Sequence, residues 1–217
     1  MIMQLLRKFL ILMLVVTLTA CSSFLDQQDT PPSSEQLPLE AVQTPSKEVV
    51  NWSSKAIDLF NQANKYLQND SEKAANLLNQ AIIIEPKMEA AYFNLMRLYL
   101  DNSKSEEMQL VYIAADKEQV LSARMLNLMA TEKRTKGLFR EAETLYLSAL
   151  SKNSTQLSVL ANMAILQDLY LHNLPEAQKY YLQYQKQLTA EEKQDKRLAN
   201  WLADIKRRIA KLNKESN

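Results

Sequence analysis

The sequence predicts an all-helical protein built from repeated helix pairs, and three observations lead to that prediction. The 217 residues include a single glycine, which disfavours the tight turns of a β sandwich. Ala, Leu, Gln, Lys and Glu, all good helix formers, dominate the chain from Trp52 onward. In the same region, alanine and large apolar residues recur at intervals of 34 positions.

The rare residues limit the chemistry that the chain can perform. One glycine excludes a P-loop and a G-x-G-x-x-G turn. One Cys excludes an internal disulfide, and a single Cys with a single His excludes a zinc site of the Cys/His type. His172 ends a predicted helix, where histidine is ordinary capping chemistry. We therefore expect no catalytic residue, no metal site and no cofactor.

The charge balance argues against a nucleic-acid partner. Lys and Arg total 26, Asp and Glu total 25, and the formal net charge is +1. Binding to the phosphate backbone relies on a marked excess of basic side chains. We expect the partners to be proteins.

Residues 1–20 predict a signal peptide. Arg7 and Lys8 form a basic start, and an apolar stretch of about ten residues follows at 9–18. A membrane-spanning helix needs about 20 apolar residues, so this stretch is too short for a comfortable span.

The single cysteine follows this segment directly. Residues 18–21, Leu-Thr-Ala-Cys, resemble the lipobox of bacterial lipoproteins. The resemblance implies cleavage before Cys21 and its acylation, with palmitate among the acyl groups, so that Cys21 is the lipidation site and membrane anchor. Ser22 and Ser23, in place of Asp, favour the periplasmic face of the outer membrane in a Gram-negative host. The alternative is a cleaved secretory signal or an uncleaved anchor with an incidental Cys21.

Residues 21–51 predict a lipidated N-terminus and a disordered tether. This segment holds four of the six prolines and shows no sustained period of 2 or 3.6 residues. A flexible chain of about 30 residues has a mean reach of about 30 Å. The folded body could therefore stand clear of a membrane while attached to it.

The remaining chain, 52–217, predicts a helical domain. Ser103 with Glu106 and Thr189 with Glu192 have the spacing of capping boxes, and Pro175 suits a first helical turn. We expect helices at about 53–68, 71–84, 88–100, 104–115, 117–135, 138–151, 155–171, 175–187 and 190–213.

Similar side chains recur through this domain at intervals of 34 residues. Ala81, Ala115 and Ala149 form one such set, typical of helix crossings where only a small residue fits. The interval and residue types resemble the tetratricopeptide repeat (TPR), a helix–turn–helix unit of 34 residues. Met96 and Met108 stand where that family has small residues, so the second repeat departs from the pattern. The resemblance implies four repeats, at about 56–88, 89–122, 123–156 and 157–190.

The last predicted helix, 190–213, has an apolar stripe that includes Trp201 and Ile205 and a charged opposite face. A repeat stack needs an end cap with a polar outer face, and we interpret this helix as that cap. The alternative is a basic patch that touches anionic lipid or an acidic partner, diluted by acidic residues such as Asp204. The predicted fold class is thus an all-α, TPR-like superhelical array of antiparallel helix pairs with a C-terminal capping helix.

TPR proteins bind partners on the concave surface lined by the first helix of each repeat, and the resemblance implies the same role for the matching positions here. These positions combine aromatic anchors with Arg side chains that can receive carboxylates. Ordinary surface is the alternative for each one. The predicted partner-binding residues are Phe60, Asn64, Phe93, Arg97, Arg124, Asn127, Thr131, Arg134 and Asp168.

The resemblance to TPR lipoproteins implies a non-enzymatic scaffold that is anchored through Cys21 and binds other envelope proteins. The architecture is similar to the pilotin-type TPR lipoproteins of type IV pilus biogenesis, although those carry more than four repeats. That similarity implies an assembly factor for a type IV pilus or a related secretion machine. Two alternatives are an adaptor for peptidoglycan hydrolases or synthases and, less favoured, a cell-wall enzyme. Paired carboxylates such as Glu141 and Glu143 face solvent on a predicted helix and lack the shared cleft that acid–base catalysis needs.

Overall fold

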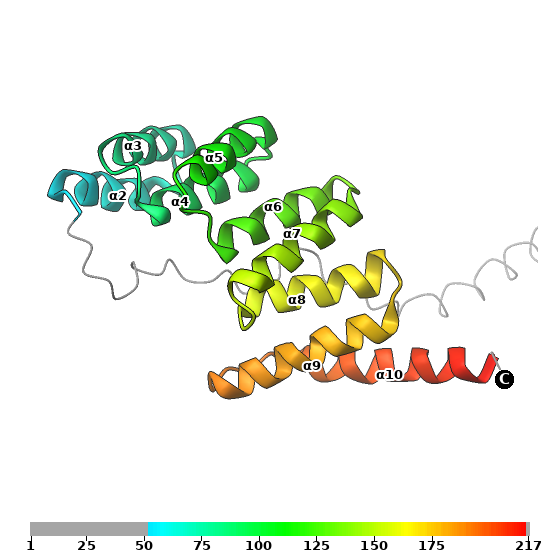
Figure 1. Ribbon diagram of the computed structural model, residues 1–217. Helices are drawn as coiled ribbons and strands as arrows, with labels where there is room; N and C mark the ends of the chain where they lie inside the picture. Colours follow the sequence, from blue (N-terminus) through cyan, green and yellow to red (C-terminus); the bar gives the residue numbers. More distant parts are fainter. Residues whose placement is uncertain (1–51, 216–217) are drawn as a thin grey trace, which may run out of the picture. The chain divides into compact units, whose positions relative to one another are not determined.

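The computed structural model describes residues 52–215, so the predicted signal peptide, Cys21 and the tether lie outside the described residues. Within the described range the regular structure is helical throughout, with no strand. Figure 1 shows the helices in chain order. They are α2 (Ser54–Tyr66), α3 (Ser71–Ile84), α4 (Glu89–Asp101), α5 (Ser105–Lys117), α6 (Ala123–Thr135), α7 (Phe139–Lys152), α8 (Leu157–Ile165), the π-helix η2 (Leu166–Tyr170), α9 (Leu174–Ala190) and α10 (Leu198–Glu215).

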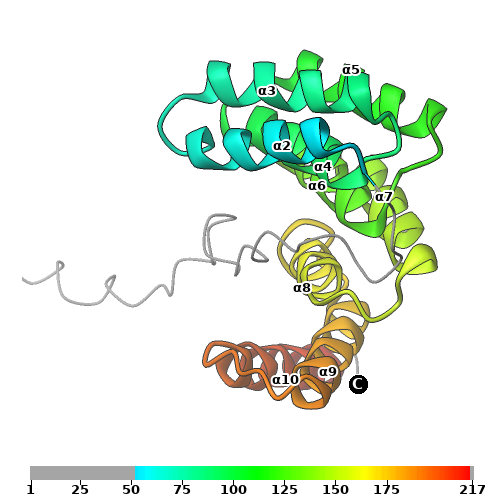
Figure 2. The same cartoon turned by 90° about the vertical axis from the view of Figure 1, so that its left-hand side faces the viewer.

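The helices pack as consecutive pairs. The first member of each pair, the A helix, is α2, α4, α6 or α8 with η2, and its partner, the B helix, is α3, α5, α7 or α9. Successive pairs are joined because α3 packs on α4 and because α6 contacts both α4 and α8. Figure 2 shows the same order from the side, with α2 and α3 at one end of these helices and α9 and α10 at the other. The predicted all-α, TPR-like fold is confirmed.

The alanines of the 34-residue interval lie at the helix crossings. Ala81, Ala115 and Ala149 are all fully buried, which allows the paired helices to approach closely. Met96 and Met108, the two departures from the pattern, are also fully buried and belong to one apolar cluster. Methionine is flexible enough to fill such a crossing. The second repeat therefore forms its helix pair with larger side chains at the contact.

Local side-chain bonds explain where several helices begin. The Asp70 side chain accepts a bond of 3.0 Å from the Lys73 backbone N–H and so caps α3. Asn173 caps α9 by accepting from the Glu176 N–H. Pro175 lies in the first turn of α9, as predicted, where its missing N–H costs nothing.

Both predicted capping boxes are wrong. Ser103 has a φ of 56°, which places it in the left-handed turn after α4, and Lys104 rather than Ser103 precedes α5. Thr189 lies inside α9, where its hydroxyl donates to the Gln185 carbonyl. An S/T-x-x-E pattern occurs by chance in a helix-rich sequence, and only the backbone conformation at its first residue distinguishes a true cap.

Most predicted helix ends are shifted by up to three residues, and three predicted helices differ by more than such a shift. The helix expected at 117–135 begins at Ala123, because the left-handed Gln119 ends α5 and opens a short link. The helix expected at 155–171 is α8 followed by η2. The helix expected at 190–213 begins at Leu198, because α9 continues to Ala190 and the left-handed Glu192 then turns the chain.

The capping helix α10 covers the last pair. Leu198 and Ile205 on α10 are buried, and α10 packs along α9. The Trp201 ring lies 5.5 Å from the Tyr181 ring of α9, centroid to centroid. One stripe of α10 therefore closes the apolar end of the stack, as a terminal cap must.

Candidate functional site

The nine predicted partner-binding residues all lie on A helices or on η2. The structure thus places them on the first helices of successive pairs, as the repeat pattern predicts. Most of them are nevertheless covered by the neighbouring helix pair. Those that are at most 9% exposed are Phe60, Phe93, Asn127, Arg134 and Asp168.

At the junction of the first two pairs, an amide bond joins α2 to α4. The Asn94 side-chain amide donates to the Asn64 side-chain oxygen at 2.8 Å. Asn94 is buried and Asn64 is half-buried. A buried amide that lacked this partner would lose its hydrogen bonds to water without replacement, so the bond specifies how the two helices meet.

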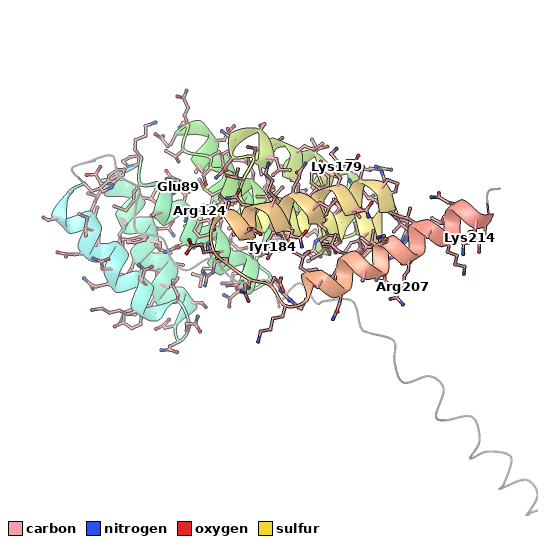
Figure 3. The ribbon with its side chains drawn as sticks, turned by 90° about the horizontal axis from the view of Figure 1, so that it is seen from below. Glu89, Arg124, Lys179, Tyr184, Arg207 and Lys214 are labelled. Atoms are coloured by element: carbon pink, nitrogen blue, oxygen red, sulfur yellow. The ribbon has the colours of Figure 1, made fainter. Side chains whose placement is uncertain are left out.

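At the next junction, an ion pair joins α4 to α6. Glu89 opens α4, and one of its carboxylate oxygens accepts from Arg124 Nη2 at 2.7 Å. The other oxygen accepts from the Ser122 hydroxyl at 2.6 Å. The Arg124 guanidinium also lies 4.3 Å from the centre of the Phe93 ring. Figure 3 shows Glu89 and Arg124 side by side. The Arg124 guanidinium thus contacts two residues of α4, Glu89 and Phe93.

The junction between α6 and α8 repeats the amide bond of the first junction. The Asn162 amide donates to the Asn127 side-chain oxygen at 2.9 Å, and both residues are buried. Thr131, one turn further along α6, lies 3.2 Å from the Tyr146 hydroxyl of α7. At this junction Asn127 bonds α6 to α8 and Thr131 bonds α6 to α7, although both residues were predicted to bind a partner.

At the end of the stack, charged side chains form the bonds between elements. Arg134 Nη1 donates to the Tyr170 hydroxyl at 3.4 Å, which links α6 to η2. Asp168 of η2 accepts from Arg208 Nη1 at 2.6 Å, which links η2 to α10. Burial raises the pKa of the Asp168 carboxyl, and the contact with Arg208 opposes that shift without cancelling it. Asp168 therefore attaches the capping helix to the stack.

Arg97 differs from the other predicted arginines because its ion pair stays within its own helix. Its Nε lies 3.7 Å from an Asp101 carboxylate oxygen one turn along α4, and 15% of the Arg97 side chain is exposed. Burial raises the pKa of Asp101, and the Arg97 charge partly offsets this. Of the nine predicted residues, the half-buried Asn64, Arg97, Arg124 and Thr131 keep some access to solvent.

The sequence pattern did not indicate the residues to which the predicted residues are bonded. They are Glu89, Asn94, Asn162, Tyr170 and Arg208. A signal for the asparagines was present, since Asn94, Asn127 and Asn162 are spaced by nearly one repeat. No comparable spacing marks Arg208, because it bonds across 40 positions to a residue in a different kind of element.

A small open pocket lies among the described residues. An open pocket of about 130 Å³ lies where α3 begins, α4 ends and α5 begins, with Tyr99, Asn102 and Lys104 among its walls. Typical ligand pockets are about 300–1,000 Å³, so this one is small. Across residues 52–215, no three His, Cys, Asp or Glu side chains gather where they could hold a metal ion. In the same range, no helix has the length and apolar character needed to cross a membrane.

Comparison with known proteins supports the architecture. No protein-family model matches the chain, and no curated protein matches it either. Among solved structures, the chain is similar to one described as "Functional Characterization of Pseudomonas Aeruginosa pilF", with a TM-score of 0.59 at 20% sequence identity. The chain has a TPR-like fold. The match covers 72% of this chain and 70% of the PilF chain, so the similarity extends over most of both.

Proposed function

We propose that this TPR-like protein is a membrane-anchored scaffold of the bacterial envelope that binds another envelope protein and performs no chemistry of its own. The observation that carries the proposal is the stack of helix pairs and its similarity to the PilF structure over 72% of the chain. The proposed specific role is that of an assembly factor for a type IV pilus or a related secretion machine.

The proposed anchor is Cys21, on the basis of its lipobox-like sequence, and Ser22 and Ser23 favour the periplasmic face of the outer membrane as its location. Several acyl chains, each contributing about 0.8 kcal/mol per buried CH₂, would hold the protein there stably. Replacing Cys21 by Ser in the full-length chain should move the protein from the membrane fraction to the soluble fraction when the membranes are washed with high salt, which releases proteins held by charge alone. Full retention of the Cys21→Ser variant on membranes would reject the lipid anchor.

In-cell crosslinking of the tagged full-length protein, followed by mass spectrometry, tests the role. Recovery of a secretin or pilus component supports the assembly-factor role. Recovery of peptidoglycan hydrolases or synthases selects the adaptor role instead. If crosslinkers of several lengths capture no protein at all, the scaffold proposal fails, and a search for enzymatic activity becomes the next step.

Arg97 is the predicted binding residue best suited to a test of the A-helix surface. It keeps partial access to solvent, and its ion pair is internal to α4, so its loss leaves the junctions between pairs intact. Arg97→Glu should lower the yield of the crosslinked partner about tenfold, as expected for an arginine central to an interface. Lys152→Glu, an exposed change at the end of α7, provides the matched control. Equal yields from the two variants would exclude Arg97 from the interface.

A further inference from the structure

The capping helix α10 presents two faces of opposite character. Its apolar stripe packs within the fold, with Leu198 and Ile205 buried and the Trp201 ring tilted against the Tyr181 ring. Arg208, at the edge of that stripe, bonds inward to Asp168 at 2.6 Å. The opposite face is exposed to solvent, and no other described helix packs on it.

The exposed face of α10 is basic along its C-terminal half. Lys206, Arg207, Lys211 and Lys214 are all exposed. At 3.6 residues per turn, these four positions occupy about two-fifths of the helix circumference. The exposed positions between them are small or neutral, namely Ala199, Asn200, Ala203 and Ala210. We name these four basic residues the α10 basic face. In Figure 3, Arg207 on this face points away from α9.

Acidic side chains do not neutralise this face. The helix from Leu198 to Glu215 contains five basic residues and two acidic ones, Asp204 and Glu215. Asp204 lies at the edge of the face and is shared between Arg207, at 3.0 Å, and Arg208, at 3.4 Å. Glu215 lies 3.8 Å from Lys211 at the end of the helix. Exposed pairs of this kind are weak and screened, so the face keeps a net positive field. The whole chain has a net charge of only +1, so the excess on α10 is local.

We propose that the α10 basic face binds the surface of an anionic lipid bilayer, with the helix lying flat against the headgroups. Clusters of four to eight Lys and Arg residues on an amphipathic helix are typical of contact with anionic lipids, at about 1 kcal/mol for each basic residue near the surface. The face has this number of basic residues, and its charge complements a negative bilayer.

The shape of the face favours a bilayer over an acidic protein. The alanines between the basic residues have small side chains that project little from the helix. The face also lacks the aromatic residues that anchor many protein interfaces. Three of the four basic residues are lysines, whose flexible stems suit a diffuse array of headgroups better than one fixed carboxylate. Contact is mainly electrostatic, because Leu198, Trp201 and Ile205 of the apolar stripe already pack within the fold, and among the large apolar residues of α10 only Leu212 is exposed.

This contact is independent of the lipid anchor and of partner binding. It would orient the helical domain at the membrane, because α10 caps one end of the stack and that end would lie against the bilayer. An acyl chain joined to the body through the predicted tether would not impose such an orientation by itself. The two attachments would together bind more firmly than either one alone.

Vesicle sedimentation tests the proposal with the full-length chain carrying Cys21→Ser, so that an acyl anchor cannot contribute. The protein is mixed with phosphatidylcholine vesicles that contain or lack phosphatidylglycerol. We expect tighter binding to the anionic vesicles, weakened by added salt. Replacing Lys206, Arg207, Lys211 and Lys214 by Gln should reduce that binding about tenfold or more. Binding to vesicles of phosphatidylcholine alone should stay unchanged.

A matched control changes the same number of charges elsewhere. Lys55, Lys65, Lys117 and Lys152 are exposed on other helices, and their replacement by Gln gives the same net charge. This control should bind within about threefold of the parent protein. A third variant, with Lys206, Lys211 and Lys214 replaced by Arg, keeps the charge and should bind like the parent.

Three results would overturn the proposal. The first is a parent protein that binds both kinds of vesicle equally, which would leave an acidic protein as the occupant of the face. The second is an equal loss in the two Gln variants, which would make net charge rather than α10 responsible. The third is failure of the Arg variant to bind while its circular dichroism spectrum is unchanged. None of these results bears on whether crosslinking captures an envelope protein, so the two proposals can fail separately.

Discussion

The A helices inside the stack and the capping helix α10 place their polar side chains in opposite ways. On the A helices, polar groups face the next helix pair and are bonded there, as Asn127 is to Asn162 and Arg124 is to Glu89. On α10, Arg208 alone bonds inward to η2, and four other basic residues face outward. An inner A helix has neighbours on more than one side, whereas α10 packs on the last pair alone.

This difference shows how position in a repeat array changes the meaning of a residue. The same kind of side chain, an arginine at helical spacing, joins two helices at Arg124 and meets solvent at Arg207. Burial of a polar group is tolerated only when it is hydrogen-bonded, so the inner positions are constrained by stability. The outer face of α10 has no such constraint and is available for contact with something outside the fold.

The largest expected difference between the two regions concerns core packing. Leu95 in α4 is fully buried, whereas Leu202 in α10 is half-buried. Leu95→Ala should lower the free energy of unfolding by about 2–5 kcal/mol, because it leaves a cavity in a closed site. Leu202→Ala should cost about 1 kcal/mol, because solvent already reaches that site. Urea denaturation of the two variants measures both values, and equal losses would contradict the distinction between stack and cap.

The buried amide bond gives the next largest effect. Asn127→Leu removes the acceptor of the Asn162 amide and should lower the free energy of unfolding by about 1–3 kcal/mol, the cost of a buried group without a partner. Replacing both residues by Leu removes both polar groups and should restore much of that loss. The double-mutant cycle is read from urea unfolding midpoints. A double variant as unstable as the sum of the two single variants would show that the two residues do not act as a pair.

Two carboxyls at the cap should titrate on opposite sides of the ordinary aspartate value. For Asp168, burial raises the pKa despite the Arg208 contact. For Asp195, burial favours the neutral acid, but the side chain and backbone N–H of Arg197, each bonded at 3.0 Å, outweigh it and hold the pKa low.

The two groups therefore contribute to stability in opposite directions. The native state binds a proton at Asp168 more readily than the unfolded chain does, so this group stabilises the fold as the pH falls through its raised pKa. Asp195 contributes stability above the ordinary value and loses it as the pH falls through its lowered pKa. Carboxyl NMR titration, assigned with Asp168→Asn and Asp195→Asn, should find Asp168 titrating at the higher pH. The reverse order would show that the Arg208 contact dominates over burial.

The smallest effect is expected on the α10 basic face. Replacing Lys206, Arg207, Lys211 and Lys214 by Gln should change the free energy of unfolding by less than about 0.5 kcal/mol for each residue, because exposed side chains contribute little. Thermal unfolding monitored by circular dichroism measures the change. A large loss of stability would mean that these residues serve the cap itself, and the vesicle result would then have to be read against the folded fraction.

The fold was predictable because its signals are local and repeated. The 34-residue alanine interval identified the helix crossings, and Ala81, Ala115 and Ala149 are all fully buried there. Helix ends were less predictable, because Ser103 and Thr189 match a capping pattern that only the backbone conformation can reject. Gln119 and Glu192 adopt left-handed conformations, which their residue types do not predict because this conformation is routine only for glycine and, less often, Asn or Asp.

The candidate site was predictable only in part, for a different physical reason. Repeat positions identified which residues lie on the A helices, and the structure places all nine predicted residues there or on η2. Repeat positions do not indicate whether a side chain on that helix meets solvent or the next helix pair. Asp168 and Arg134, two of the predicted partner-binding residues, are buried at junctions and bonded to Arg208 and Tyr170. Whether any of the nine residues contacts a partner stays a prediction.

By itself, the sequence determined the helical class, the repeat interval and the amphipathic division of the last helix, since each follows from composition and from spacing along one segment. The tertiary structure decided which polar residues join one helix to another and which face outward. The Asn64–Asn94, Glu89–Arg124 and Asp168–Arg208 bonds connect positions 30, 35 and 40 residues apart. Such bonds depend on how whole helix pairs stack, and stacking depends on the fit of many side chains at once rather than on any local pattern.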